Sequence, residues 1–214
     1  IGELHIFPTI EEGYEFIINN YSNELPKPFI YNGSDDISLF LDNHYEELKD
    51  NFYFTNGAGG LCKYLNKYNI TKLAEECGLV IPKEELLETG QMPSLLKYPV
   101  FTKAVTSAGG GAWKDQAFIC KNEEELLKAY KNIKVPNILV QEFIEKKNEL
   151  CIDGISINGG EQVFMPYGCG YYRFIPGSYG NYMRFTPFID EDLTARIIEV
   201  IRMAKFTGIF CIEF

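Results

Sequence analysis

The N-terminal part of the chain alternates between short apolar runs and longer amphipathic stretches. The apolar runs predict β-strands over residues 4–7, 29–31 and 51–55. The stretches between them, residues 11–21 and 36–48, place apolar side chains at helical spacing. Strands that alternate with helices of this length usually form a parallel sheet with crossover helices. This part of the sequence therefore predicts a small α/β unit.

The rest of the chain also mixes helices and strands. A helix over residues 66–77 is followed by Gly78, a residue that favours helix termination. A second helix is expected after Asn122, with Glu125 completing a capping box, and a third after Asp190. Strands are expected over residues 98–104, 138–141, 150–157 and 209–214. The pattern predicts an α/β fold along the whole sequence.

A glycine-rich run at residues 57–60 invites comparison with the dinucleotide-binding motif G-x-G-x-x-G. Cys62 stands where that motif needs its last glycine, and no acidic residue ends a following strand at the expected distance. We therefore interpret the run as an ordinary turn between a strand and a helix.

Composition narrows the class of protein. The 214 residues include 30 acidic and 20 basic side chains, giving a net charge of −10, so broad binding to nucleic acid is not expected. A small phosphate-bearing ligand stays open, because a pocket needs only a few cations and backbone amides. The six cysteines are scattered, which favours reduced thiols in a cytoplasmic protein. No apolar run is long enough to span a membrane, and no signal peptide is visible.

The first segment with potential chemistry joins a strand to glycines. Lys103 lies near the end of an apolar strand, and Gly109, Gly110 and Gly111 follow it. A cation would thus lie beside a backbone that can approach phosphate oxygens closely. Glycine runs are also common at hairpin tips, so this segment alone does not decide between a phosphate-binding loop and a hairpin.

A second segment, residues 141–144, ends a buried strand and offers main-chain groups to the edge of an adenine, with Phe143 and Ile144 as apolar cover. A strand that runs into a charged surface turn is the alternative. Glu149 and Asp153 fall on one face of the next strand, where they are either solvated or line a site for ribose hydroxyls or a metal.

Glu213 is the last candidate from the residues alone. It stands in an apolar strand, where a desolvated carboxylate needs a partner, a proton or a metal. A glutamate on an edge strand that faces water is an equal alternative.

Taken in order, five segments resemble the motifs of the ATP-grasp superfamily. They are the helix that Asn66 and Lys67 open, the strand 97–104, the glycine-rich loop 107–114, the adenine hinge 141–144 and the strand 208–214. Residues 63–214 resemble an ATP-grasp domain of two subdomains that clamp a nucleotide, with a small lid subdomain over about residues 98–145. Residues 1–62 resemble the Rossmann-like pre-ATP-grasp domain.

The resemblance implies ATP and Mg²⁺ as cofactors. Gln141, Glu142 and Ile144 would read the adenine with Phe143 beside it, Glu149 would hold the ribose, and Glu213 would bind Mg²⁺. The residues expected to contact or close over the phosphates are Lys67, Lys103, Gly109, Gly110, Gly111 and Lys114.

Within the superfamily, the segments 7–9 and 168–180 most resemble carboxylate–amine ligases, which include D-aspartate ligase and proteins similar to the large subunit of carbamoyl phosphate synthase. This implies that a small carboxylic acid is activated as an acyl phosphate and attacked by a small amine. A carbamoyl-phosphate-synthase-like or kinase-type enzyme, or a non-catalytic ATP-binding module, is the alternative. The E-x-N-x-R segment of the family, expected after Phe214, is not in this sequence, so the resemblance predicts that the chain as given does not turn over.

Arg173 and Arg184 are candidates for binding a substrate carboxylate or the γ-phosphate as a bidentate fork, and we prefer Arg173. Two surface arginines are the alternative. No nucleic-acid or membrane partner is expected, and the oligomeric state stays open, with a homodimer among the options.

Overall fold

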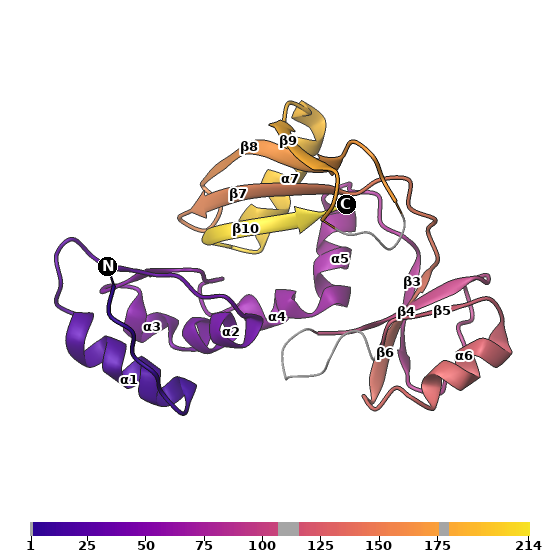
Figure 1. The fold of residues 1–214 in the computed structure, drawn as a ribbon, viewed down its shortest axis with the longest axis horizontal. Helices are drawn as coiled ribbons and strands as arrows, with labels where there is room; N and C mark the ends of the chain where they lie inside the picture. The colour runs from indigo at the N-terminus through magenta and orange to yellow at the C-terminus, as the bar shows by residue number, and fades with distance from the viewer. Residues whose placement is uncertain (1, 107–115, 176–179) are drawn as a thin grey trace.

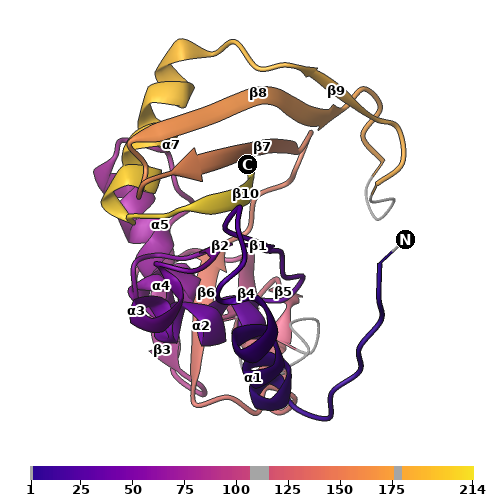
Figure 2. The same ribbon diagram turned by 90° about the vertical axis from the view of Figure 1, so that its left-hand side faces the viewer.

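The computed structural model describes residues 2–106, 116–175 and 180–214. Its strands form three sheets, with the orders β1-β2, β3-β6-β4-β5 and β10-β7-β8-β9. Figure 1 shows each sheet with its own helices, and α4 and α5 run between the three groups. In Figure 2, turned by 90°, the β10-β7-β8-β9 sheet lies above the β3-β6-β4-β5 sheet.

The N-terminal group is a small parallel unit, as the sequence predicts. Its elements are α1 (Ile10–Tyr21), β1 (Phe29–Ile30), α2 (Asp35–Asn43), α3 (Tyr45–Leu48) and β2 (Tyr53–Phe54). β1 and β2 pair in parallel, and the buried side chains of Leu41, Leu48, Phe52 and Phe54 form the core between them and the helices.

Two expectations for this unit are wrong in detail. Residues 4–7 form no strand, and Leu4 and Ile6 are 85% and 83% exposed, so their apolar character is not used for packing. The helix expected over residues 36–48 is divided into α2 and α3 at His44, whose φ of −100° and ψ of 22° leave the helical region.

The β3-β6-β4-β5 sheet is antiparallel throughout. It consists of β3 (Glu84–Glu88), β4 (Val100–Ala104), β5 (Phe118–Cys120) and β6 (Asn137–Glu142). One face is covered by α6 (Glu123–Tyr130), whose Leu126 packs with Val100, Ile138 and Val140 in a buried cluster. The predicted cap is confirmed, because the Asn122 side chain accepts from the Glu125 amide at 3.0 Å.

The remaining sheet packs one face on a long helix. Its elements are β7 (Leu150–Ile157), β8 (Gln162–Tyr171), β9 (Met183–Pro187), α7 (Glu191–Met203) and β10 (Gly208–Glu213). Ile152 and Met165 pack against Ile197 and Ile201 of α7, which Asp190 caps as predicted. On its other side α7 contacts α5 (Lys67–Glu76), which follows the short α4 (Leu61–Leu65).

Within the described ranges, no helix combines the length and the apolar character that crossing a membrane requires.

Candidate functional site

The start of α5 is joined to the segment that follows β4. Asn66 caps the helix and forms an isolated antiparallel bridge with Thr106, and the Lys67 amide donates to the Val105 carbonyl at 2.7 Å. Since Lys103 lies on β4 only a few residues earlier, two lysines that are distant in sequence converge. The resemblance to the ATP-grasp motifs implies that both lysines contact phosphates.

Both lysines have a lowered pKa, and the charge of Lys67 contributes to the shift of Lys103. Burial lowers the pKa of Lys67 from its ordinary 10.5, an effect that Asp35 opposes. Burial also lowers the pKa of Lys103; the Glu84 carboxylate opposes this shift, and the positive charge of Lys67 adds to it. Two like charges in partial burial would be relieved by a ligand that carries several negative charges. The pair is therefore suited to a polyphosphate.

Lys103 and Gln141 share one face of their sheet. Gln141 of β6 lies opposite both Glu84 of β3 and Phe101 of β4, and side chains two residues apart on a strand point to the same side. Lys103 is two residues beyond Phe101, so Glu84, Gln141 and Lys103 project from the face opposite the one that α6 covers. The sheet thereby brings an expected phosphate ligand and an expected adenine ligand together.

Glu84 is a residue of this site that the sequence did not reveal. Its side chain is 2% exposed, and one carboxylate oxygen lies 3.7 Å from Lys103 Nζ and accepts from Gln141 Nε2 at 3.0 Å. The other oxygen accepts from the Thr71 hydroxyl of α5. In the sequence, Glu84 belongs to a charged run after a proline, which looks like solvated surface; no local pattern marks it as buried.

The expected adenine hinge begins at the end of β6 and is held by its neighbours. The Glu142 amide donates to the Lys83 carbonyl at 2.9 Å, and the Phe143 amide donates to the Pro99 carbonyl at 3.1 Å. In the described part of the chain, no hydrogen bond engages the amide of Ile144, whose residue is 51% exposed. This amide is available to the ring nitrogen of a purine.

The strand expected to hold the ribose and metal ligands alternates as predicted. Ile152 is fully buried in the core, while Glu149, Cys151 and Asp153 fall on the opposite face of β7. The Glu149 side chain, 17% exposed, forms an ion pair with Lys146. Across the ladder, Cys151 lies opposite Glu213 of β10, which puts both expected carboxylates on one face.

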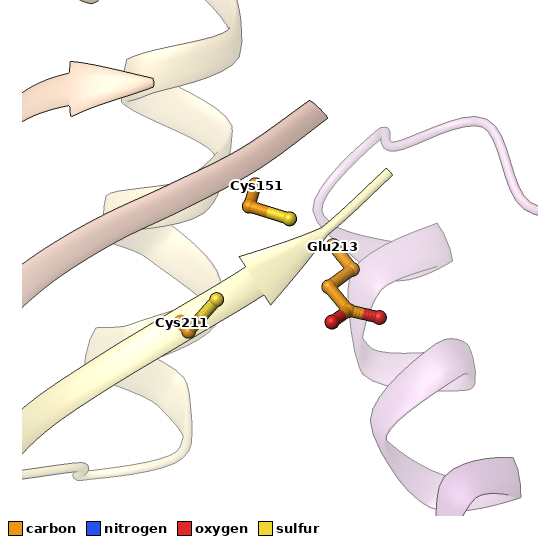
Figure 3. A group of neighbouring side chains, drawn as sticks. All are labelled: Cys151, Cys211 and Glu213. Atoms are coloured by element: carbon orange, nitrogen blue, oxygen red, sulfur yellow. The ribbon is translucent and has the colours of Figure 1, made fainter. Parts of the chain in front are cut away.

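Glu213 belongs to a small cluster of potential metal ligands. The carboxylate and the thiols of Cys151 and Cys211 offer ligand atoms that all lie within 4.8 Å of one another. Figure 3 shows Cys151 on β7 beside Cys211 and Glu213 on β10. Mg²⁺ prefers oxygen ligands and keeps much of its shell for phosphates and water, so the carboxylate suits it and the thiols do not.

The other expected site residues either lie outside the described ranges or are exposed arginines on or near β8 and β9. Gly109, Gly110, Gly111 and Lys114 lie outside the described residues. Arg173, just beyond β8, is exposed and places its guanidinium carbon 5.2 Å from the ring centroid of Tyr182; Arg184 is exposed on β9.

The glycine-rich run at residues 57–60 is a structural turn, as the sequence analysis concluded. The buried carboxylate of Asp42 accepts from the amides of Gly57 at 2.7 Å, Gly59 at 3.0 Å and Leu61 at 2.6 Å. Amides that already bind an internal carboxylate are not available to a nucleotide phosphate.

Solved structures share this arrangement of helices and sheets. An L-amino acid ligase from Bacillus licheniformis matches 82% of this chain and 42% of its own, with 17% identity and a TM-score of 0.58. Pyruvate carboxylase from Rhizobium etli matches 96% of this chain and 19% of its own, with 14% identity and a TM-score of 0.66. An N5-carboxyaminoimidazole ribonucleotide synthetase in complex with ADP matches 86% of this chain and 49% of its own, with 15% identity and a TM-score of 0.60.

These similarities establish the fold: the chain has the ATP-grasp fold that its sequence motifs predicted. The chain spans less than half of the length of each of these three proteins. No protein-family model and no curated protein sequence matches it.

Proposed function

We propose that this chain is the ATP-binding part of an ATP- and Mg²⁺-dependent ligase that joins a carboxylic acid to an amine. The observation that carries the proposal is the convergence of Lys67 and Lys103 next to the sheet face that holds Gln141. The similarity to an L-amino acid ligase and to an ADP-bound synthetase supports the reaction type and the nucleotide.

In this proposal, each part of the site has one task. Lys67 and Lys103 neutralise the α- and β-phosphates, with the glycines 109–111 and Lys114 closing over them. Gln141 and the main chain of Glu142 and Ile144 bind the adenine, and Glu149 binds the ribose hydroxyls. Positioning and charge neutralisation of this kind are the main requirements of phosphoryl transfer.

The reaction has two steps. A carboxylate oxygen of the acid attacks the γ-phosphorus of ATP, the bond to the bridging oxygen breaks, and ADP leaves. The amine nitrogen then attacks the acyl carbon of the acyl phosphate, inorganic phosphate leaves, and the nitrogen loses a proton. We assign Arg173 to the substrate carboxylate or the γ-phosphate, because it is exposed and its guanidinium suits bidentate binding.

Glu213 holds the metal in this proposal. Bound Mg²⁺ would neutralise charge on the phosphates, and Glu213 provides the oxygen ligand that such an ion prefers. We also place the protein in the cytoplasm, a proposal that its six unpaired cysteines support.

The function is tested in the full-length protein by Mg-ATP binding and by ADP release. Calorimetry would compare the wild type with Lys103→Ala and with Lys128→Ala as a control, because the Lys128 side chain is exposed on α6 and forms an ion pair with Glu124 of the same helix. Loss of a charge-assisted contact to phosphate should weaken binding about tenfold or more in the first variant and leave the second unchanged. Equal affinity in all three proteins would refute the phosphate assignment.

Substrate class follows from ADP release over a panel of amino acids, amines and bicarbonate. Release that needs both an acid and an amine identifies the ligase. Release with bicarbonate identifies a carbamoyl-phosphate-type enzyme. Nucleotide binding without any ADP release identifies a non-catalytic module, and no nucleotide binding at all removes the proposal.

A further inference from the structure

We propose that Glu84 determines the base specificity of the nucleotide site by fixing the orientation of the Gln141 amide. The inference rests on the proposed function, since it assumes that Gln141 faces the purine. It adds a residue that none of the sequence motifs contains.

The first step is the chemistry of a glutamine at this position. Its amide has a donor end and an acceptor end of similar size, so its neighbours decide which end faces a ligand. An ionised carboxylate only accepts, and Glu84 therefore binds the Gln141 Nε2 end, at 3.0 Å. Among the described residues, no hydrogen bond engages the Oε1 end, which remains as an acceptor.

The second step is that Glu84 itself is held firmly. It is nearly fully buried at the contact of β3 and α5, and three donors surround its carboxylate: the Thr71 hydroxyl, the Gln141 amide and the Lys103 ammonium. Several donors around one buried carboxylate are the environment that its ionised form requires. Because all three neighbouring groups are donors, the Glu84 carboxylate acts as the acceptor in its hydrogen bond with Gln141.

The consequence concerns the purine. Adenine carries an exocyclic amino group, a donor that suits Gln141 Oε1, whereas hypoxanthine carries a carbonyl oxygen at the same position. An acceptor held in place favours the amino group and leaves the carbonyl facing another oxygen. A freely turning amide would serve both purines. Glu84 is in this sense a positioning residue that acts through Gln141.

The experiment measures the ratio of the dissociation constants for ATP and inosine triphosphate in the full-length protein. This ratio is independent of the fraction of folded protein, because both nucleotides are measured on the same sample. We expect the wild type to prefer ATP by about tenfold or more. Glu84→Met, which keeps the volume without an acceptor, should lose the part of that preference that the Gln141 amide contributes, whereas the part that the Ile144 amide contributes through the purine ring nitrogen should be the same in both proteins. Glu84→Gln keeps an oxygen that can accept from Gln141 and should retain the preference.

A matched control and a second pair of variants keep the test decisive. Glu88→Met changes an exposed glutamate on the same strand and face and should leave the ratio unchanged. If Glu84→Met does not fold, Gln141→Glu replaces it: two facing carboxylates should weaken ATP binding about tenfold, and the exchange Glu84→Gln with Gln141→Glu should restore it.

The outcomes separate the two proposals. A wild type that binds neither nucleotide overturns both the function and the role of Glu84. A wild type that binds both equally, or a Glu84→Met variant that keeps the full preference, overturns only the role of Glu84. A Glu84→Gln variant that loses the preference also overturns it, as does an exchange that fails to restore binding.

Discussion

The main-chain amide of Lys67 donates a hydrogen bond of 2.7 Å to the carbonyl of Val105. This bond fixes the first turn of α5 to the end of β4, so the distance between the two candidate phosphate ligands is set by backbone contacts. A site built on such contacts is positioned before any nucleotide arrives, which reduces the entropy lost on binding.

Nucleotide binding should be accompanied by proton uptake in alkaline solution. Burial lowers the pKa of Lys67 and Lys103 below 10.5, and the phosphates would raise both again. Between the lowered pKa and 10.5, a fraction of each lysine is neutral and gains a proton on binding; at lower pH both are already charged. Calorimetry in buffers of different ionisation enthalpy measures the uptake, which should shrink in Lys103→Met. Equal uptake in that variant would contradict the assignment.

The same lysine shifts contribute stability that grows as the pH rises through this window, whereas the raised pKa values of Tyr14, Tyr130 and Cys211 contribute with the opposite sign. A basic group with a lowered folded pKa binds more protons in the unfolded chain, so the free energy of unfolding increases between the lowered pKa and 10.5. Below the lowered pKa, the full cost of burying the charge is present. Denaturant unfolding of the wild type and of Lys103→Met at several alkaline pH values isolates the contribution of this lysine, and an equal pH dependence of the two proteins would argue against a buried Lys103 ammonium.

Glu213→Gln should remove the metal-dependent part of nucleotide affinity. The neutral amide is a weaker ligand for Mg²⁺, so affinity measured with Mg²⁺ should fall about tenfold, while affinity measured with a chelator present should not change. Cys211→Ser is the matched control, because Cys211 lies two residues earlier on the same face of β10. A loss in both conditions would indicate a structural effect rather than a metal ligand.

Asp42→Ala should destabilise the N-terminal unit strongly. The substitution leaves three amides, of Gly57, Gly59 and Leu61, without their acceptor in a buried position. We expect the free energy of unfolding to fall by about 3 kcal/mol or more, as measured by denaturant titration. Asp50→Ala, at an exposed position, should change it by less than about 0.5 kcal/mol. Similar values for both variants would refute this role of Asp42.

Gly208→Ala should also destabilise the protein, for a steric reason. Gly208 has a φ of +123°, and an added Cβ would lie 2.5 Å from Thr55 Oγ1 and 2.8 Å from Thr55 Cα. Strain and overlap together should cost about 2 kcal/mol or more, seen as a lower midpoint of unfolding. Gly33→Ala, with no atom within 4 Å of the added carbon, is the control. An unchanged midpoint would mean that β10 adjusts without cost.

Many helices and strands could be predicted from the sequence, because helix caps and strand alternation depend on residues that are close in the chain. Asn66, Asn122 and Asp190 each cap the expected helix, and Glu149 and Ile152 take opposite faces of the expected strand. These features depend on a few neighbouring residues, so a single sequence contains them.

The strand β3 and the burial of Glu84 could not be predicted from the sequence, because both depend on pairing with a strand that is distant in the chain. β3 has the sequence Glu-Glu-Leu-Leu-Glu, which lacks strand alternation, and it is a strand because β6 pairs with it. Glu84 is buried for the same reason. The strand expected at residues 4–7 fails in the opposite way, since no strand of the described structure pairs with it and the side chains of Leu4 and Ile6 stay exposed. The motifs name Lys103 and Gln141 as expected ligands, but no motif contains Glu84, the carboxylate that contacts both side chains.

The register of β10 against β7 also determines which β10 side chains face the core and which face the candidate site. Ile212 packs in the core beside α7, and Glu213 faces the other side. Thr207 exchanges two hydrogen bonds with Asn56 before the strand, and Phe214 exchanges two with Leu150 after it. A one-residue insertion or deletion before Gly208 would exchange the faces, burying a carboxylate and exposing an isoleucine. We therefore expect natural variation in length to be excluded from this turn, whatever substitutions its residues accept.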